Sequence, residues 1–202
     1  MPSSSDTYLH GHHDSVLRSH RWRTAENSAG YLLARLPADA RVLDVGCGPG
    51  TITADLAARV PDGSVTGIDA AGDVLALAQA EADRRGQDNV RFEVGDVYEL
   101  GFDDGTFDVV HAHQVLQHLS DPVAALREMR RVCRPGGLVA ARDGDYGGMF
   151  WFPADPGLAE WQALYRNVAR ALGGDLTVIS APARGSTFTV ILPSDRAGVA
   201  TK

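Results

Sequence analysis

Two patterns of hydrophobic positions alternate along this chain. Residues 42–45 and 107–112 are short, nearly continuous apolar runs, as buried parallel strands require, and residues 65–69 form another short strand that ends in an acid. Residues 52–60, 73–85 and 122–133 instead repeat their apolar side chains with helical spacing, for example at Ile52, Leu56 and Val60. Strands that alternate with helices predict an α/β fold with a doubly wound, mostly parallel, Rossmann-like sheet and helices on both faces.

Turn and cap signals refine this prediction. We expect the helix over residues 73–85 to bury Val74, Leu75, Leu77 and Ala78 and to end at the following glycine. An aspartate and a proline at 121–122 have the preferred chemistry of an N-cap and first helical position. Further strands are predicted at residues 90–94, which alternate, and at 138–141, after a proline- and glycine-rich helix end.

The two ends of the chain are predicted to differ from this core. Residues 16–36 have helical character, and residues 158–172 are expected to form a last helix. Residues 176–193 alternate around a Pro-Ala-Arg-Gly-Ser turn, which predicts a C-terminal antiparallel hairpin at the sheet edge. We therefore divide the chain into an N-terminal helical segment (1–36), a central α/β domain (37–172), and a hairpin with a loose tail (173–202).

A glycine-rich turn joins the first strand to its helix. Gly46, Gly48 and Gly50 allow the backbone to approach a ligand where a Cβ would collide. Asp44 lies at the strand end just before them, and a carboxylate beside such a turn suits a ligand with an ammonium group. The alternative for Asp44 is a carboxylate that stabilises a tight turn. Asp69, at the end of the second strand, has nearly the spacing at which an acid binds ribose hydroxyls; its alternative is a helix cap.

Imidazole groups cluster after the strand at 107–112. The ends of the first and fourth strands flank the point where the strand order reverses, and ligands bind there in this architecture. His113 and His118 are candidate general bases, since imidazole titrates near neutrality. A solvent-facing position at a helix start is the alternative for His118, and His111, inside the strand, is predicted to be structural. Asp143, Asp145 and Tyr146 follow the fifth strand and are candidates for a substrate pocket.

Several of these segments together resemble class I S-adenosylmethionine-dependent methyltransferases. The resemblance covers about residues 8–172 and is closest to the ubiquinone/menaquinone-biosynthesis-like branch that methylates small molecules. The segments that carry it, in order and at the usual spacing, are residues 42–51, 67–69, 95–97, 107–110 and 126–137.

The resemblance implies a role for each matching residue. Asp44 and the loop residues Gly46, Cys47, Gly48 and Gly50 would hold the methionine end of the cofactor. Asp69 and Ala70 would bind the ribose, Asp96 and Val97 the adenine, and His113 and Gln114 would close the site. In related enzymes the segment ahead of the first motif covers the cofactor, which makes Tyr8, His12 and Trp22 candidate lid residues.

The amino-acid composition limits the kinds of binding partner and cellular setting that we expect. Across 202 residues the net charge is −7, which disfavours nucleic acid or an anionic membrane as the main partner. Two cysteines, Cys47 and Cys133, suggest no disulfide framework, so we expect a reducing, cytoplasmic setting. Separately, we expect a monomer or homodimer. Four histidines between His10 and His20 lack the accompanying pattern of a metal site, and no metal is predicted.

The sequence thus predicts methyl transfer from S-adenosylmethionine to a small-molecule acceptor. Two alternatives are a protein that binds this cofactor without catalysis and a nicotinamide-dependent oxidoreductase, although Asp44 and the glycine spacing disfavour the latter. Residues 172–193 are similar to the closing hairpin of sensor histidine kinase ATP-binding domains. The nucleotide-binding motifs of such kinases are absent, so a signalling fragment is the weakest alternative.

Overall fold

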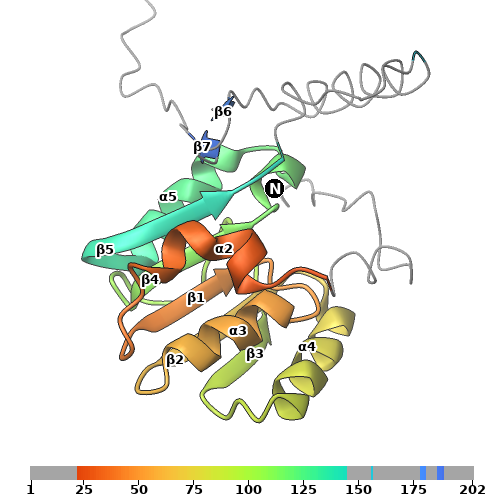
Figure 1. The fold of residues 1–202 in the computed structure, drawn as a ribbon. Coiled ribbons are helices and arrows are strands. Elements are labelled where there is room, and N and C mark those ends of the chain that lie inside the picture. The colour runs from red at the N-terminus through yellow and green to blue at the C-terminus, as the bar shows by residue number, and fades with distance from the viewer. Residues whose placement is uncertain (1–21, 145–155, 157–177, 181–185, 189–202) are drawn as a thin grey trace, which may run out of the picture. The chain divides into compact units, whose positions relative to one another are not determined.

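The computed structural model describes residues 22–144, 156, 178–180 and 186–188. The chain divides into two compact units, residues 1–144 and 145–202, and each is described by itself. The first unit contains a five-stranded parallel sheet with the strand order β3-β2-β1-β4-β5 (Figure 1). Its strands are β1 (Arg41–Val45), β2 (Ser64–Asp69), β3 (Val90–Val94), β4 (Phe107–His113) and β5 (Cys133–Arg142).

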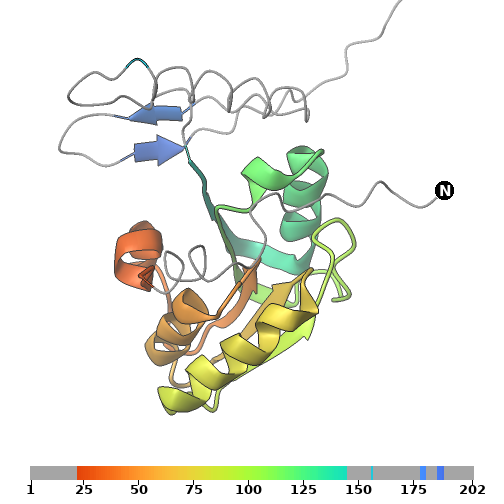
Figure 2. The same ribbon diagram turned by 90° about the vertical axis from the view of Figure 1, so that its right-hand side faces the viewer.

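Helices cover both faces of this sheet. The helices α2 (Ala25–Leu33), α3 (Thr51–Arg59) and α4 (Gly72–Arg84) lie on one face, and α5 (Pro122–Val132) lies on the other (Figure 2). A 3₁₀ turn, η1 (Leu116–His118), follows β4. The chain reverses its direction of winding between β1 and β4, which are neighbours in the sheet, so the predicted doubly wound parallel sheet is confirmed.

Each face of the sheet has its own hydrophobic core. On the α5 face, Leu43, Val110 and Met129 are fully buried, and the loop between β3 and β4 adds Val97 and Leu100. On the α2 and α3 face, the core contains Leu32, Val42, Leu56 and Val109. Successive β1 residues therefore alternate between the two cores, which is the reason why this strand is an unbroken apolar run apart from Asp44.

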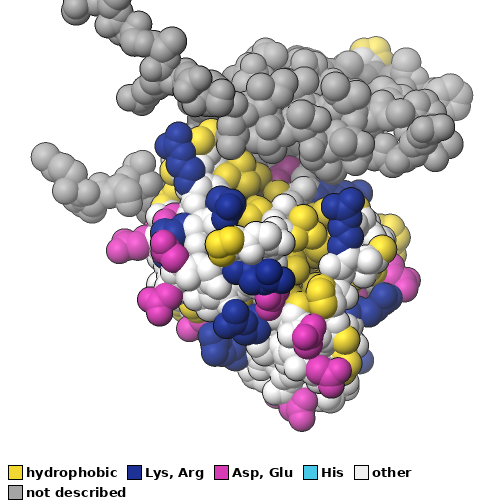
Figure 3. Space-filling model, turned by 90° about the vertical axis from the view of Figure 1, so that its left-hand side faces the viewer, with side chains coloured by type: hydrophobic (Ala, Val, Ile, Leu, Met, Phe, Trp, Pro, Cys, Tyr) yellow, Lys and Arg dark blue, Asp and Glu magenta, His cyan; other side chains and the backbone are white. Residues whose placement is uncertain are grey.

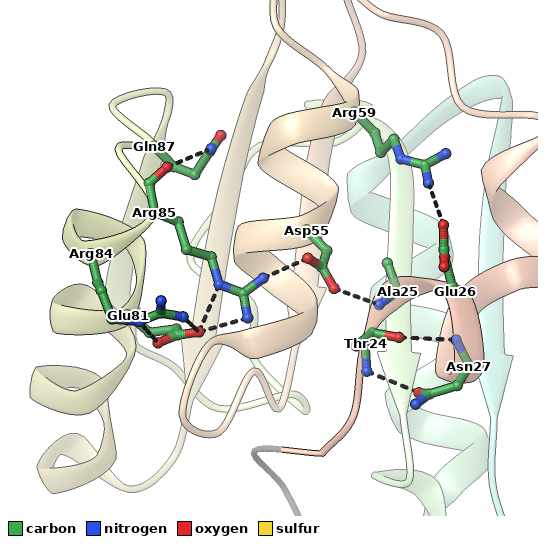
Figure 4. Close-up of polar contacts among 10 residues, drawn as sticks. All are labelled: Thr24, Ala25, Glu26, Asn27, Asp55, Arg59, Glu81, Arg84, Arg85 and Gln87. Atoms are coloured by element: carbon green, nitrogen blue, oxygen red, sulfur yellow. Dashed lines mark hydrogen bonds and ion pairs between the residues drawn. The ribbon is translucent and has the colours of Figure 1, made fainter.

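Polar contacts join the three helices of one face. The Asp55 carboxylate on α3 accepts the backbone N–H of Ala25 at the start of α2 (2.8 Å) and pairs with Arg85 after α4 (2.5 Å), as Figure 4 shows. The same guanidinium contacts Glu81. Thr24 begins α2 with a reciprocal capping box to Asn27.

The face of the first unit drawn in Figure 3 carries basic and acidic side chains side by side. The ion pairs of this unit include Arg134–Asp108 and Arg131–Glu128. In the part of the chain that the structure describes, no helix is both long and apolar enough to span a membrane.

Four details differ from the prediction. The α2 helix begins at Ala25 after its Thr24 cap and ends at Leu33, so residues 22–24 and 34–36 are not part of it, and residues 16–21 of the predicted helical stretch lie outside the described residues. The side chain of Leu77 is 38% exposed, whereas Val74, Ala78 and Ala82 form the buried stripe. The β5 strand begins at Cys133 and not near 138, because its first residue already pairs with Phe107 before a register shift. The β4 strand extends one residue further, to His113.

The second unit is described only at Pro156 and in two short strands. The strands β6 (Val178–Ser180) and β7 (Ser186–Phe188) pair with each other in an antiparallel two-stranded sheet. Whether this hairpin completes the edge of the main sheet stays a prediction, as do the domain boundaries. The expected helix at 158–172 lies outside the described residues.

Candidate functional site

The carboxyl ends of the parallel strands bring most of the predicted site residues to one edge of the sheet. Backbone hydrogen bonds tie these ends together. The N–H of Cys47 donates to the carbonyl of Ile68 (2.9 Å), and the N–H of Gly95 donates to that of Asp69 (3.1 Å). After β4, the N–H of Gln114 donates to the carbonyl of Arg142 at the end of β5 (2.7 Å). This edge includes the switch point between β1 and β4.

The loop after β1 requires its glycines. Gly46, Gly48 and Gly50 all adopt left-handed backbone conformations, with φ of 67°, 53° and 77°. A Cβ on Gly50 would lie 2.8 Å from the Cα of Ala78 on α4, and a Cβ on Gly46 would strike the Val115 side chain. The loop is therefore packed tightly between the start of α3, helix α4 and the segment after β4.

Asp69 supports this loop directly. One carboxylate oxygen accepts the N–H of Gly48 (3.0 Å), and the other accepts the N–H of Ala71 (3.0 Å). Each oxygen of a carboxylate has two acceptor positions, so both oxygens keep capacity for a further donor. The side chain is half-buried and the following residue, Ala70, is exposed. Asp69 can thus shape the loop and bind hydroxyl groups at the same time.

Asp44 faces inward, and the residue is only 3% exposed. Its oxygens accept the hydroxyl of Thr53 on α3 (2.6 Å) and the Nδ1–H of His111 on β4 (2.7 Å). His111 is itself fully buried, which agrees with its predicted structural role. The carboxylate therefore holds β1, β4 and α3 in place beneath the glycine loop, and its contact with a ligand ammonium stays a prediction.

Of the two predicted adenine-binding residues, Asp96 is exposed and Val97 is buried. The Asp96 side chain is exposed, and its carboxylate accepts the N–H of Tyr98 (2.8 Å). Val97 is 9% exposed and packs into the core on the α5 face. The turn that follows β3 therefore combines a buried anchor with a carboxylate at its surface.

His113 ends β4 and is nearly buried, with 9% exposure. Burial, aided by the nearby Arg23, His111 and Arg142, lowers the pKa of His113 to about 3. A ring with a lowered pKa is a weak proton acceptor at neutral pH, so burial opposes a general-base role of His113, which stays a prediction. Its Nδ1 atom has no hydrogen-bond partner among the described residues.

Gln114 has an unusual backbone for a residue with a Cβ. Its φ of 56° is left-handed, and among the described residues it is the only non-glycine with positive φ. Its side-chain oxygen accepts a hydrogen bond from Arg23, ahead of α2. Strained backbone of this kind is concentrated at functional sites, so Gln114 is a strong candidate for a ligand contact.

The segment that follows is held by the end of β5. The buried Asp143 carboxylate accepts the backbone N–H of Gln117 (3.2 Å). Burial raises the pKa of Asp143 to about 6, although backbone hydrogen bonds from Gln117, Leu116 and Val115 act in the opposite direction. The Gln117 side chain contacts the Nε2 atom of the half-buried His118 (3.1 Å).

Cys47 and Cys133 behave as buried thiols. Burial, together with Asp44 and Asp69, raises the pKa of the Cys47 thiol far above its usual range, so it is a poor nucleophile. Burial also raises the pKa of Cys133. No group of three or more His, Cys, Asp or Glu side chains in the described part of the chain could hold a metal ion.

The predicted lid and pocket residues are only partly described. Trp22 is 78% exposed, while Tyr8, His12, Asp145 and Tyr146 lie outside the described residues.

Four residues that contact predicted site residues were not themselves predicted. They are Arg23, Thr53, Gln117 and Arg142. The Arg142 guanidinium donates to the carbonyls of Asn27 and Ser28, beside a kink in α2 at Ala29. The one sequence signal that could have indicated Arg142 as a site residue is its position at the end of a predicted strand.

Comparison with known proteins gives consistent matches. The profile of a methyltransferase-domain family matches residues 36–181. An uncharacterised methyltransferase of Schizosaccharomyces pombe is 42% identical over 151 residues, which are 71% of this chain and 54% of that protein. A demethylmenaquinone methyltransferase of Roseiflexus castenholzii is 36% identical over 159 residues, 76% of this chain and 61% of that protein.

A crystal structure of an S-adenosylmethionine-dependent methyltransferase from Aquifex aeolicus has the same fold. The two match with a TM-score of 0.59 at 22% identity, over 82% of this chain and 89% of that one. The chain spans about half the length of the curated relatives it matches.

Proposed function

Since the chain belongs to the methyltransferase-domain family, we propose that it binds S-adenosylmethionine at the carboxyl edge of its sheet and transfers the methyl group to a small molecule. The observation that carries this proposal is the pairing of the left-handed glycine loop with Asp69 through the N–H of Gly48. It joins a close-approach loop to a carboxylate with remaining acceptor capacity.

The residues present fit this cofactor. The glycine loop leaves backbone near the ligand without side chains, and Asp69 can accept from two ribose hydroxyls. The exposed Asp96 carboxylate can accept from the adenine amino group. Bound S-adenosylmethionine supplies an electrophilic methyl group on a sulfonium.

The chain's own residues would chiefly align the reactants, because a displacement needs orientation more than a covalent intermediate. Gln114, held by Arg23, and the nearby His113 would close the methionine end of the site. Asp44 would act there mainly by fixing Thr53 and His111. A small-molecule acceptor accords with the relative named as a demethylmenaquinone methyltransferase.

Calorimetric titration with S-adenosylhomocysteine, with NADH as the comparison ligand, tests the proposal. We expect micromolar binding of the first and none of the second. Asp69→Ala should weaken binding by about 1–3 kcal/mol, the scale for a lost hydrogen-bond partner that carries charge. Asp62→Ala is the matched control, since Asp62 is an exposed acid in the turn before β2, at the amino-terminal ends of the strands.

Binding of NADH in place of S-adenosylhomocysteine would favour an oxidoreductase. Absence of S-adenosylhomocysteine binding by a cooperatively folded protein would refute the cofactor assignment. Binding without turnover over a broad panel of acceptors would reduce the proposal to cofactor binding.

A further inference from the structure

The strand β3 is an outermost strand of the five-stranded sheet, where β2 is its neighbour (Figure 1). None of the residues Val90–Val94, all of which the structure describes, is buried, whereas β1, β2 and β4 are largely buried. Val94 is 64% exposed although its side chain is apolar. An open strand edge with apolar side chains is a template for pairing with another strand.

The backbone of β3 directs alternate residues away from the sheet. The carbonyl of Asn89 accepts the N–H of Val65 (2.9 Å), and the N–H of Gly95 donates to the carbonyl of Asp69 (3.1 Å). Because the N–H and C=O groups of successive strand residues point to opposite sides, the odd-numbered residues of this stretch bond β2 and the even-numbered residues face outward. The outward residues are Val90, Phe92 and Val94. No other strand of the described part of the chain pairs with them.

Two charged side chains lie on this open strand. Arg91 and Glu93 are separated by one residue, so they lie on the same face of the sheet. Both are exposed, and neither has an ion-pair partner among the described residues. By contrast, the exposed Arg84 and Arg134 pair with acids of their own unit. The edge therefore carries one positive and one negative charge that are available to a partner.

We propose that β3 joins two copies of this chain, through antiparallel pairing with β3 of the second copy about a two-fold axis at Phe92. In this register Arg91 of each copy lies opposite Glu93 of the other. The exposed Val94 of each copy is then covered by Val90 of the other. The outward residues make the backbone hydrogen bonds, so the charged residues fall at the non-hydrogen-bonded pairs, where opposite side chains are closest. Such a contact uses the same patch on both copies and closes as a dimer.

The charges select this register over its neighbours. Sliding one copy by one repeat of the strand pleat would place Arg91 opposite Arg91 of the second copy, or Glu93 opposite Glu93. Parallel pairing in register would also put like charges side by side. Like charges directly opposite each other are destabilising. Pairing also stops soon after β3, because the chain turns at Asp96, which bridges to Glu99.

Sedimentation velocity of the whole chain, without ligand, tests the dimer. We expect a concentration-dependent shift from monomer to dimer with an affinity in the micromolar range or weaker, because a contact between two strands is smaller than a standard interface. Arg91→Glu puts like charges at both cross-strand pairs and should weaken self-association by about tenfold or more. Arg127→Glu is the matched control. It makes the same charge change at an exposed position on α5 and should dimerise like the wild type.

Complementary variants separate the register from a general effect of charge. Glu93→Arg should also lose self-association when it is alone. An equimolar mixture of the Arg91→Glu and Glu93→Arg chains should regain the dimer, because opposite charges then face each other at both pairs. The double variant Arg91→Glu/Glu93→Arg should regain it as a homodimer. These recoveries would also show that the single variants are folded.

A protein that stays monomeric from about 5 to 500 µM would overturn the inference, since even a small specific interface should be populated there. Dimerisation that both single variants leave unchanged, or a mixture of the two that does not associate, would overturn it as well. The inference does not depend on the proposed function. Loss of the dimer would leave methyl transfer untouched, and absence of S-adenosylhomocysteine binding would leave the dimer untouched.

Discussion

Replacing Gly50 by alanine should destabilise the protein through two separable effects. The left-handed φ of 77° costs a residue with a Cβ about 1–2 kcal/mol. The new Cβ would also lie 2.8 Å from both the Cα and the Cβ of Ala78, and neither atom is the end of a flexible side chain. Forcing an extra methyl group into a packed contact costs about 1–3 kcal/mol. We therefore expect Gly50→Ala to lower the free energy of unfolding by about 2–5 kcal/mol.

Gly86→Ala is the matched control. Gly86 has a similar φ of 67°, but a Cβ there would have no atom within 4 Å. Both variants carry the backbone cost, and both lose the same conformational entropy of the unfolded chain. The difference between them should therefore isolate the packing of the loop on α4, at about 1–3 kcal/mol.

Urea denaturation at 25 °C measures both values, and calorimetry with S-adenosylhomocysteine measures the consequence for the site. In Gly50→Ala either the loop or α4 has to shift, so the affinity should fall, whereas Gly86→Ala should bind like the wild type. Equal losses of stability in the two variants would show that α4 does not press on the glycine loop. Unchanged affinity in Gly50→Ala would show that the loop is not at the ligand site.

Three further predictions concern single side chains. The pKa of Asp143 is raised to about 6, above its value in the unfolded chain, so its contribution to stability is favourable below pH 4 and is lost as the pH rises through 6. The stability of wild type relative to Asp143→Asn should therefore fall by about 2 kcal/mol from pH 4 to 7 in urea titrations, and a constant difference would contradict the burial of the charge. Cys47 should react with iodoacetamide only after unfolding, and rapid alkylation of the native protein, read by mass spectrometry, would contradict its raised pKa. Asp55→Ala removes the partner of Arg85 and of the Ala25 N–H and should cost about 1–3 kcal/mol of unfolding free energy in the same assay, against little change for Asp62→Ala.

The sequence by itself determined the order of elements. Apolar runs and helical spacing depend on local backbone geometry, so the strands at Val42, Val65 and Val90 and the helix after Pro122 could be predicted. The glycine loop could be predicted for the same reason, since left-handed turns select glycine wherever they occur. The prediction that Leu77 is buried was wrong. Helical spacing shows which side chains share a face, but it does not show how much of that face the neighbouring elements cover.

Only the tertiary structure decided which side chains meet at the strand ends. Asp44 and His111 are 67 positions apart in the chain, and they touch because β1 and β4 are neighbours in register. Asp143 and Gln117 meet because β5 ends beside the segment after β4. Such contacts depend on strand order and on which face each side chain takes. A sequence pattern records neither, so it predicted which strands end in polar side chains but not the contacts between those side chains.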